Sequence, residues 1–426
     1  MQRGFYTIMA AQFFSSLADN ALFVAAIELL KEADAPEWQR AALVPMFALF
    51  YVILAPFVGA FADLLPKGRV MFLANILKIG GCALMLFGVH PLLAYTVVGL
   101  GAAAYSPAKY GILTELLPPS QLVKANGWIE GLTIASIILG VLLGGQLIGP
   151  KISSVLLEID IPNLELGIES APEAAICFIV IFYLLAAGFN LGIPLTGAKM
   201  IALPGRFSDL LTDFWRCNNA LWRDKLGQIS LATTTLFWGV SGNLRYIVLA
   251  WAAAALAYNT TQASNLVGVV ALGTAVGAVL ASTRVRLHEA PRVIPLAITM
   301  GVLVIMLIFI DNVWVAAPFL IMLGGIGGYL VVPMNALLQH RGHNLMGAGR
   351  SIAVQNFNEQ ACILGLGFLY TSATGVGVSA FTAIAGFGVL VASFMWVIGR
   401  WHSSNLIHHK VEVERLLEIA RSDKSH

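Results

Sequence analysis

Long apolar segments fill most of this chain and constrain its fold more than any other feature. The 426 residues are 58% hydrophobic and only 11% charged, whereas a soluble domain is about 25% charged. A helix needs about 20 apolar residues to cross a bilayer. The segments are continuous and lack the period-two alternation of a barrel, so they predict an all-α integral membrane protein with twelve transmembrane helices. They cover roughly residues 5–31, 40–62, 68–89, 91–117, 125–149, 172–196, 227–257, 264–283, 291–311, 313–339, 348–371 and 376–401.

The longest polar link, residues 197–226, divides the twelve segments into six and six. It predicts two six-helix halves, 1–196 and 227–401, followed by a tail at 402–426. Most of the 25 Lys and Arg residues lie in the link, the tail and the loops on their side of the membrane, which predicts that both termini are cytoplasmic. Trp215 and Trp222 among the charges of the link indicate an amphipathic surface helix. The charged tail indicates a solvated helix or a frayed end.

Asp19 lies near the middle of the first segment, where a carboxylate costs about 2.5–3.5 kcal/mol on insertion scales. It belongs to a polar stripe at helical spacing that also contains Gln12, Ser15, Ser16 and Asn20. Arg245 and Trp238 lie on a similar stripe in the seventh segment. Because the first helices of two such halves face each other, we expect Asp19 and Arg245 to meet near the midplane. They form either a substrate site or an ion pair that only fixes helix packing.

Further polar residues lie inside the apolar segments. Tyr105 and Lys109 share one face of the fourth segment at i,i+4 spacing. Lys109 either adds to a cationic site with Arg245 or extends to the cytoplasmic headgroups, and we expect Lys78 to extend in this way. Glu130 and Glu359, each with an amide side chain four residues earlier, either line the cavity or tie helices together.

The loop between the second and third segments resembles the signature loop of the major facilitator superfamily. It has a glycine at 59, an acid at 63 and a Gly-Arg pair at 68–69. We expect Gly59 to permit close helix contact, Asp63 to accept from the N-terminus of the eleventh helix, and Arg69 to pair with Asp63 or Glu115. These contacts predict a conformational latch, whereas an ordinary solvated loop is the alternative.

The two halves repeat weakly. Pro107 and Pro333 are 226 residues apart, as are Asp19 and Arg245. Parallel six-helix repeats are the architecture of major facilitator transporters. The sequence therefore predicts the major facilitator fold.

Several blocks resemble the bacterial lysophospholipid transporters of that superfamily. The blocks are residues 18–22, 55–59, 67–71, 101–113, 123–127 and 332–339. The resemblance implies inward flipping of lysophospholipids across the inner membrane, followed by reacylation by an acyltransferase–acyl carrier protein synthetase. The chain departs from the family pattern in its longer loop at 150–171 and its tail after Arg400.

On this reading the headgroup site contains two opposite charges. Arg245, with Lys109, holds the phosphate. Asp19 binds an amine or holds Arg245 in place. Phe23, Phe237 and Trp238 flank the acyl chain.

Two other classes of function are less consistent with the residues. A proton-coupled exporter on the same fold would use Asp19 and Glu130 as proton carriers. A membrane acyltransferase needs a His-x₄-Asp pair, and none of the eight histidines has an aspartate five residues on. The four cysteines are far apart and no GxxxxGK[ST] loop occurs. We therefore expect no enzyme activity, cofactor, metal or nucleic-acid partner, and a monomer.

Overall fold

The computed structural model describes residues 3–116, 119–158, 168–195, 207–346 and 348–422, and all regular structure in these ranges is helical. The first half contains α1 (Arg3–Glu32), α2 (Glu37–Ile53), α3 (Ala55–Leu64), α4 (Lys67–Leu86), α5 (Pro91–Leu116), α6 (Pro119–Leu147), α7 (Pro150–Leu157) and α8 (Ala171–Leu191). The second half is preceded by α9 (Phe207–Arg223). It contains α10 (Gly227–Leu256), α11 (Thr260–Arg284), η1 (Leu287–Val293), α12 (Ile294–Met306), η2 (Leu307–Phe309), α13 (Val313–Met346), α14 (Ala348–Gly375), α15 (Ala380–His408) and α16 (Lys410–Ser422).

The all-helical membrane fold is confirmed, and each of the predicted segments falls on one helix or on adjoining helices. The second segment is broken into α2 and α3, because Pro56 in the first turn of α3 lacks an N–H group. After α6 the chain bends by 67° into α7. The sequence predicted a loop here and not a helix.

Seven helices among the described residues, or eight if α6 and α7 form one bent span, are suited to cross a bilayer by length and composition. The other predicted spans are the broken pair α2–α3 and the helices α5, α10 and α14, which do not meet this criterion over the described residues. They pack against one another: α2 contacts α5 and α14, and α10 contacts α14.

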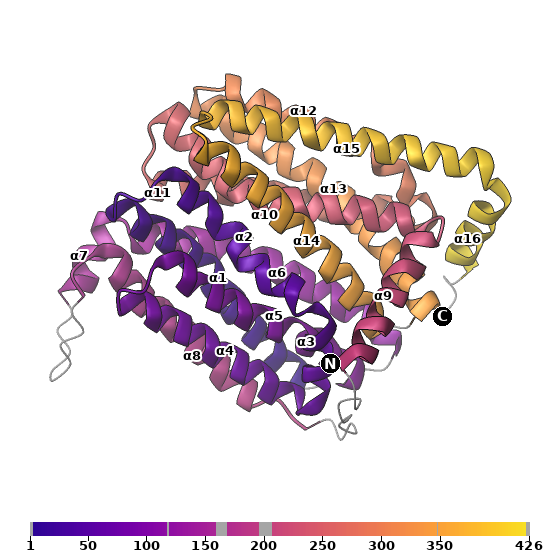
Figure 1. Cartoon of the computed structure of the whole chain (residues 1–426), viewed down its shortest axis with the longest axis horizontal. Coiled ribbons are helices and arrows are strands. Elements are labelled where there is room, and N and C mark those ends of the chain that lie inside the picture. Colours follow the sequence, from indigo (N-terminus) through magenta and orange to yellow (C-terminus); the bar gives the residue numbers. More distant parts are fainter. Residues whose placement is uncertain (1–2, 117–118, 159–167, 196–206, 347, 423–426) are drawn as a thin grey trace.

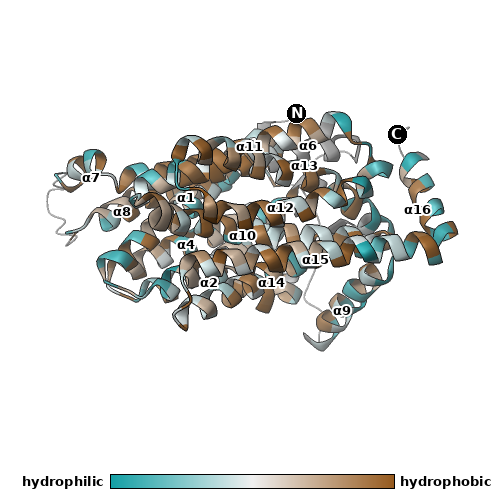
Figure 2. Cartoon of the chain, turned by 90° about the horizontal axis from the view of Figure 1, so that it is seen from above, coloured by the Kyte–Doolittle hydropathy of each residue, from teal (hydrophilic) through white to brown (hydrophobic). Residues whose placement is uncertain are grey.

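The halves lie side by side, with the second half above the first in Figure 1. In the first half α1 packs against α6 and α8, and in the second half α10 packs against α13 and α14. Two seams join the halves, one between α2 and α14 and one between α6 and α11. Both chain ends lie with α9 and α16 at one end of the bundle, which we call the tail end; α7 lies at the opposite end, the loop end. Figure 2 shows apolar residues along the sides of the bundle and hydrophilic residues towards its ends.

The tail forms a helix, the first of the two predicted alternatives, and most of its residues are exposed. Its first residues extend α15 to His408, and α16 follows after a single residue. Val413 and Ala420 of α16 are buried, with 0% and 1% exposure, because one face of this amphipathic helix packs against the bundle. The link contains the predicted amphipathic helix, α9, which buries Phe214 and Leu221 and exposes Trp215.

Glycines allow α11 and α13 to cross with their backbones in contact. Gly273 and Gly277 of α11 lie against the backbone of α13, and a methyl group added at Gly277 would overlap the carbonyl oxygen of Gly325. In the same way, Gly324 and Gly328 of α13 lie against the backbone of α11. Small residues four apart are the usual means by which membrane helices approach closely.

We predict that Gly277→Ala separates α11 from α13 and lowers the melting temperature of the purified protein in detergent. Gly365→Ala is the matched control, since nothing lies within 4 Å of a Cβ added there. It should leave the melting temperature unchanged or raise it slightly, because alanine favours a helix by about 1 kcal/mol over glycine. Equal melting temperatures for the two variants would contradict the backbone-contact interpretation.

Candidate functional site

Two charged side chains inside the first half, Asp19 of α1 and Lys78 of α4, are paired with each other. One carboxylate oxygen of Asp19 accepts a hydrogen bond from Lys78 of α4, and the other accepts from the Tyr183 hydroxyl of α8, both at 2.7 Å. Ser15 accepts from Lys78 at 3.0 Å and donates to Asn75 at 2.7 Å. We call these five residues the α1 cluster. The pairing explains how α1 can carry a carboxylate in the bilayer, where an isolated charge is costly.

The prediction that Lys78 extends to the headgroups is wrong, because only 1% of this residue is exposed. Lys78 lies 11 residues into α4, about 16 Å from the start of the helix, which is beyond the reach of its stem. Its ammonium instead lies over the rings of Tyr105 and Tyr183, 5.1 and 5.6 Å from their centroids. The cation of the α1 cluster is therefore supplied by the first half itself.

Arg245 is the charged contact between the halves in this region. Its Nη1 donates to the Asn20 side-chain oxygen at 2.8 Å, and its guanidinium lies over the Phe23 ring, 4.1 Å from the centroid. Asn20 is held in turn by a hydrogen bond from its amide nitrogen to the Ser16 carbonyl. The Arg245 Nε is buried without a hydrogen-bond partner among the described residues. This N–H group therefore has no acceptor in the described part of the chain, and it is buried in this conformation.

The expected ion pair between Asp19 and Arg245 is thus wrong in its partners. Successive residues of a helix lie about 100° apart around its axis. Asp19 accordingly faces α4 and α8 within the first half, while Asn20 faces Arg245 in the second half. The two predicted charges lie on facing helices, but each is bound to a different neighbour.

The aromatic residues expected along the acyl chain are mostly inside the protein. Phe23 is fully buried beneath Arg245, and Phe237 is 2% exposed. Neither ring is therefore accessible to an acyl chain in this conformation. Trp238 is half-buried, packed edge-on against Phe237 at 5.4 Å between centroids.

The predicted residues of α5 are both buried. Lys109 is 8% exposed and Tyr105 4%, so Lys109 does not extend into the headgroup region. The Tyr105 hydroxyl has no hydrogen-bond partner among the described residues, and its ring lies beneath Lys78. A role for Lys109 beside Arg245 stays a prediction.

A second polar group lies on α14, in the other half. The Gln355 amide donates to Glu359 at 2.8 Å and to Asn335 of α13 at 2.7 Å. Asn356, the residue after Gln355 in α14, donates a hydrogen bond to Ser106 of α5 in the other half at 3.3 Å. Glu359 is 7% exposed, so this carboxylate belongs to the interior, as the sequence predicted for a cavity or helix-tying residue.

The predicted latch and one predicted carboxylate lie largely outside what the structure describes. The surroundings of Gly59 and the side chains of Asp63, Glu115 and Glu130 lie outside the description, although the helices that carry these residues are described. Arg69 is exposed in the first turn of α4. The latch therefore stays a prediction.

Two comparisons with known sequences bear on this arrangement. A family model of the Major Facilitator Superfamily matches residues 8–365. The chain belongs to the major facilitator superfamily. Within it, the chain is 39% identical over 402 residues to a protein of Klebsiella pneumoniae named "Lysophospholipid transporter LplT", covering 93% of this chain and 96% of that protein. A Yersinia enterocolitica protein of the same name is 40% identical over 379 residues, covering 89% of each chain. The sequence resemblance is confirmed.

Solved structures of the superfamily share the fold. A bacterial homologue of the human lysosomal transporter Spinster, inward-facing and unoccupied, has a TM-score of 0.65 at 14% identity, covering 94% of this chain and 97% of that one. The nucleoside transporter NupG has a TM-score of 0.68 at 10% identity, covering 94% and 99%. At these identities the likeness concerns the fold alone.

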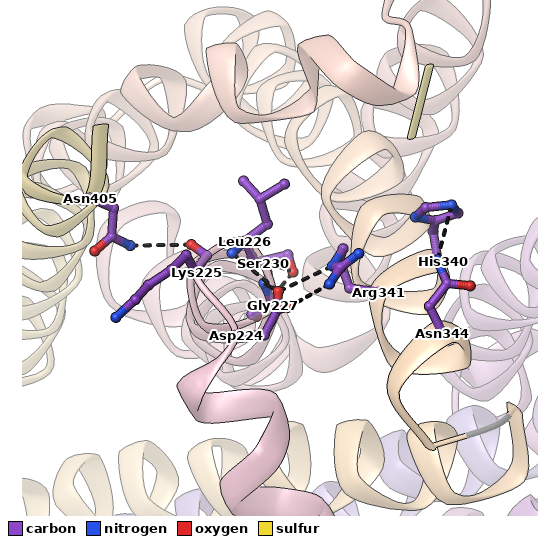
Figure 3. A network of polar contacts seen from close by, with 9 residues as sticks. All are labelled: Asp224, Lys225, Leu226, Gly227, Ser230, His340, Arg341, Asn344 and Asn405. Atoms are coloured by element: carbon purple, nitrogen blue, oxygen red, sulfur yellow. Dashed lines mark hydrogen bonds and ion pairs between the residues drawn. The ribbon is translucent and has the colours of Figure 1, made fainter. Parts of the chain in front are cut away.

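An ion pair at the tail end joins helices of the second half, the half that carries Arg245 (Figure 3). The sequence did not predict this pair. Arg341 of α13 donates to both carboxylate oxygens of Asp224, at 3.1 and 2.5 Å. The Asp224 carboxylate also accepts from the backbone N–H of Gly227 at 2.7 Å, so it caps α10. Asn405 of α15 donates to the Lys225 carbonyl. The sequence signal was an acid three residues before a helix that begins with glycine.

Helix α9 is attached to α14 beside the polar group of that helix. Trp222 donates to the Asn358 side-chain oxygen at 3.1 Å, and the Asn358 amide donates to Asn218 at 2.8 Å. Phe357 packs edge-on against Phe214, 5.2 Å between centroids. Since Glu359 follows directly in the chain, the link helix contacts α14 beside its interior carboxylate. Among the described residues, no group of three or more His, Cys, Asp or Glu side chains is arranged to hold a metal.

We predict that Lys78→Met strongly destabilises the protein, because it leaves the Asp19 carboxylate buried without its cation. Breaking a buried pair costs about 3–5 kcal/mol. The double variant Asp19→Asn/Lys78→Met removes both charges and should recover most of the lost melting temperature in detergent. Lys151→Met, at an exposed position, is the control. If Lys78→Met had the same melting temperature as this control, the α1 cluster would not hold the first half together.

Proposed function

We propose that this protein carries lysophospholipids, such as lysophosphatidylethanolamine, across the bacterial inner membrane without changing them chemically. The names of its curated relatives support this proposal. The observation in the structure that supports it best is Arg245, which lies where the halves meet and uses only part of its guanidinium fork. A lysophospholipid has one acyl chain and one phosphate, and arginine binds phosphate through paired N–H groups.

Arg245 is preorganised for the phosphate. Asn20 and the Phe23 ring hold the guanidinium from two sides, so less side-chain entropy is lost when an anion binds. No carboxylate of the α1 cluster neutralises it, because Asp19 is paired with Lys78. Lys109, buried on α5, supplies a second positive charge to the same headgroup in this proposal.

Asp19 retains a surface for a headgroup amine. Its side chain is 18% exposed, whereas that of Lys78 is 2% exposed. An ethanolamine ammonium can therefore approach the carboxylate from the side opposite Lys78 and Tyr183. We assign the wider site to Asp19, Asn20, Tyr105, Lys109, Trp238, Arg245 and Glu359, with Glu130 on the same polar interior.

Alternating access requires contacts that form and break at the two ends of the bundle. At the loop end, Thr260 of α11 donates to Glu28 and accepts from Lys31, both of α1. Nearer the tail end, Ser106 and Asn356 join α5 to α14. Rocking of the halves would break one set while keeping the other. The headgroup would then move between Arg245 and the open side, while the acyl chain follows a seam between the halves in the lipid.

The cellular setting belongs to the same proposal. In this proposal the tail end faces the cytoplasm, and both termini are therefore cytoplasmic. Transport is inward. The halves are residues 1–196 and 227–401, joined by the link 197–226 and followed by the tail 402–426. Gly59, Asp63, Arg69 and Glu115 form the latch that stabilises one state. The protein works as a monomer, and an acyltransferase–acyl carrier protein synthetase consumes its product.

We predict that Arg245→Gln lowers lysophosphatidylethanolamine uptake by spheroplasts about 10- to 100-fold. Hydrogen bonds to a charged group contribute about 1.5–3 kcal/mol, and each 1.36 kcal/mol is tenfold. Arg245→Lys should retain part of the rate, because it keeps the charge but loses the fork. Arg284→Gln, at an exposed position of α11, is the control.

Two outcomes would count against this account. Normal uptake by a folded and inserted Arg245→Gln variant would remove Arg245 from the site. Uptake in proteoliposomes that requires a proton gradient would instead favour the exporter-like mechanism.

A further inference from the structure

A cavity lies at the tail end, apart from the Arg245 site. It has a volume of about 640 Å³ and lies between the end of α15, the start of α12 with η1, and the tail helix α16. We call it the tail cavity. Ligand pockets have volumes of about 300–1,000 Å³, so it is large enough for a small molecule or a lipid headgroup.

The walls of the tail cavity combine an apolar floor with charges of both signs. Pro291, Ile294, Pro295, Leu406 and Leu417 supply the apolar part. The charged part is supplied by Arg292 of η1 and by three residues of α16, namely Glu414, Glu418 and Arg421. With two arginines and two glutamates, these walls balance in formal charge.

Two of the charged groups, Arg292 and Glu414, have weak competing partners. Arg292 is 3.0 Å from Glu289, but 80% of its side chain is exposed. Glu414 is 3.8 Å from Lys410, and both side chains are more than half exposed. Exposed pairs of this kind contribute about 0–1 kcal/mol, so a bound ligand can replace them. His402 also lines the cavity, and its Nδ1 is buried without a hydrogen-bond partner among the described residues.

The tail cavity lies at the depth where the bilayer ends. Val389 and Phe394 of α15 and Met306 of α12 are exposed apolar residues, so these helices face lipid. Nearer the tail end of α15, Trp396 is 57% exposed and Arg400 lies over its ring. Tryptophan and arginine gather at the headgroup level of a membrane. The cavity, which begins at Gly399 on this helix, therefore opens beside the headgroups of the surrounding lipid.

We propose that the tail cavity binds the headgroup of a zwitterionic bilayer phospholipid that carries a phosphate and a primary amine. Arg292 and Arg421 bind the phosphate, and Glu414 and Glu418 bind the ammonium. The acyl chains leave over Ile294 towards the exposed apolar side of α12. Binding joins α16 to the ends of α12 and α15. This lipid is a resident of the cavity, distinct from the lysophospholipid at Arg245.

The test uses the full-length protein in nanodiscs of phosphatidylethanolamine, phosphatidylcholine or phosphatidylglycerol. Lipid retained after extraction into mild detergent is counted by native mass spectrometry. We expect the wild type to retain phosphatidylethanolamine at least tenfold more than the other two, because a quaternary amine cannot donate to the glutamates and a glycerol headgroup lacks the positive charge. Arg421→Gln should lose this retention at least tenfold. Arg415→Gln, an exposed arginine on α16 outside the cavity, should retain it, as should Arg245→Gln.

Melting temperatures show whether a variant loses lipid because its cavity has changed or because the whole protein is less stable. In lipid-free detergent, Arg421→Gln and Arg415→Gln should melt together, and added phosphatidylethanolamine should stabilise only Arg415→Gln. Equal retention by these two variants would overturn the proposal. Stronger retention of phosphatidylglycerol would also overturn it, since it would indicate an anion site. The proposal would also be overturned if inorganic phosphate alone raised the melting temperature as much as phosphatidylethanolamine does.

Discussion

The ion pair of Asp19 and Lys78 inside the first half determines what the rest of the interior can do. Both charges lie in helices that cross the bilayer, and each satisfies the other at 2.7 Å with Tyr183 and Ser15 as additional partners. A buried pair is not in itself strong evidence for stability. Its effect here is to fix α1 against α4 and α8. This orientation turns the next residue, Asn20, towards the second half.

Arg245 depends on that orientation. Because Asp19 is already paired with Lys78, Arg245 meets the neutral Asn20 and an aromatic ring, and its guanidinium forms no ion pair with the side chains that the structure describes. An anion that enters between the halves can supply the missing partner. The pairs Asp224–Arg341 at the start of α10 and Trp222–Asn358 beside α14 hold the second half at the tail end. Movement of either half therefore changes the surroundings of the same guanidinium.

The sequence was sufficient to locate the predicted spans, and insufficient for the short helix α7 and for the partners of the polar residues. Periodicity and apolar length located the spans, and rarity of charge within them singled out Asp19, Lys109 and Arg245. Partner choice depends on rotations of about 100° between successive helix residues and on which helices are neighbours. A one-dimensional pattern contains neither. Lys78 was misassigned for this reason, and the Arg341 partner of Asp224 lies more than a hundred residues away in the chain.

The central claim is that Arg245 recognises the phosphate of a single-chain lipid. The most direct measurement compares the binding of lysophosphatidylethanolamine with that of a monoacylglycerol with the same acyl chain and no phosphate. Both are measured on the wild type and on Arg245→Gln in detergent. The account predicts that the wild type prefers the phosphate-bearing lipid by at least tenfold and that Arg245→Gln binds the two lipids equally. An undiminished preference in Arg245→Gln would contradict it.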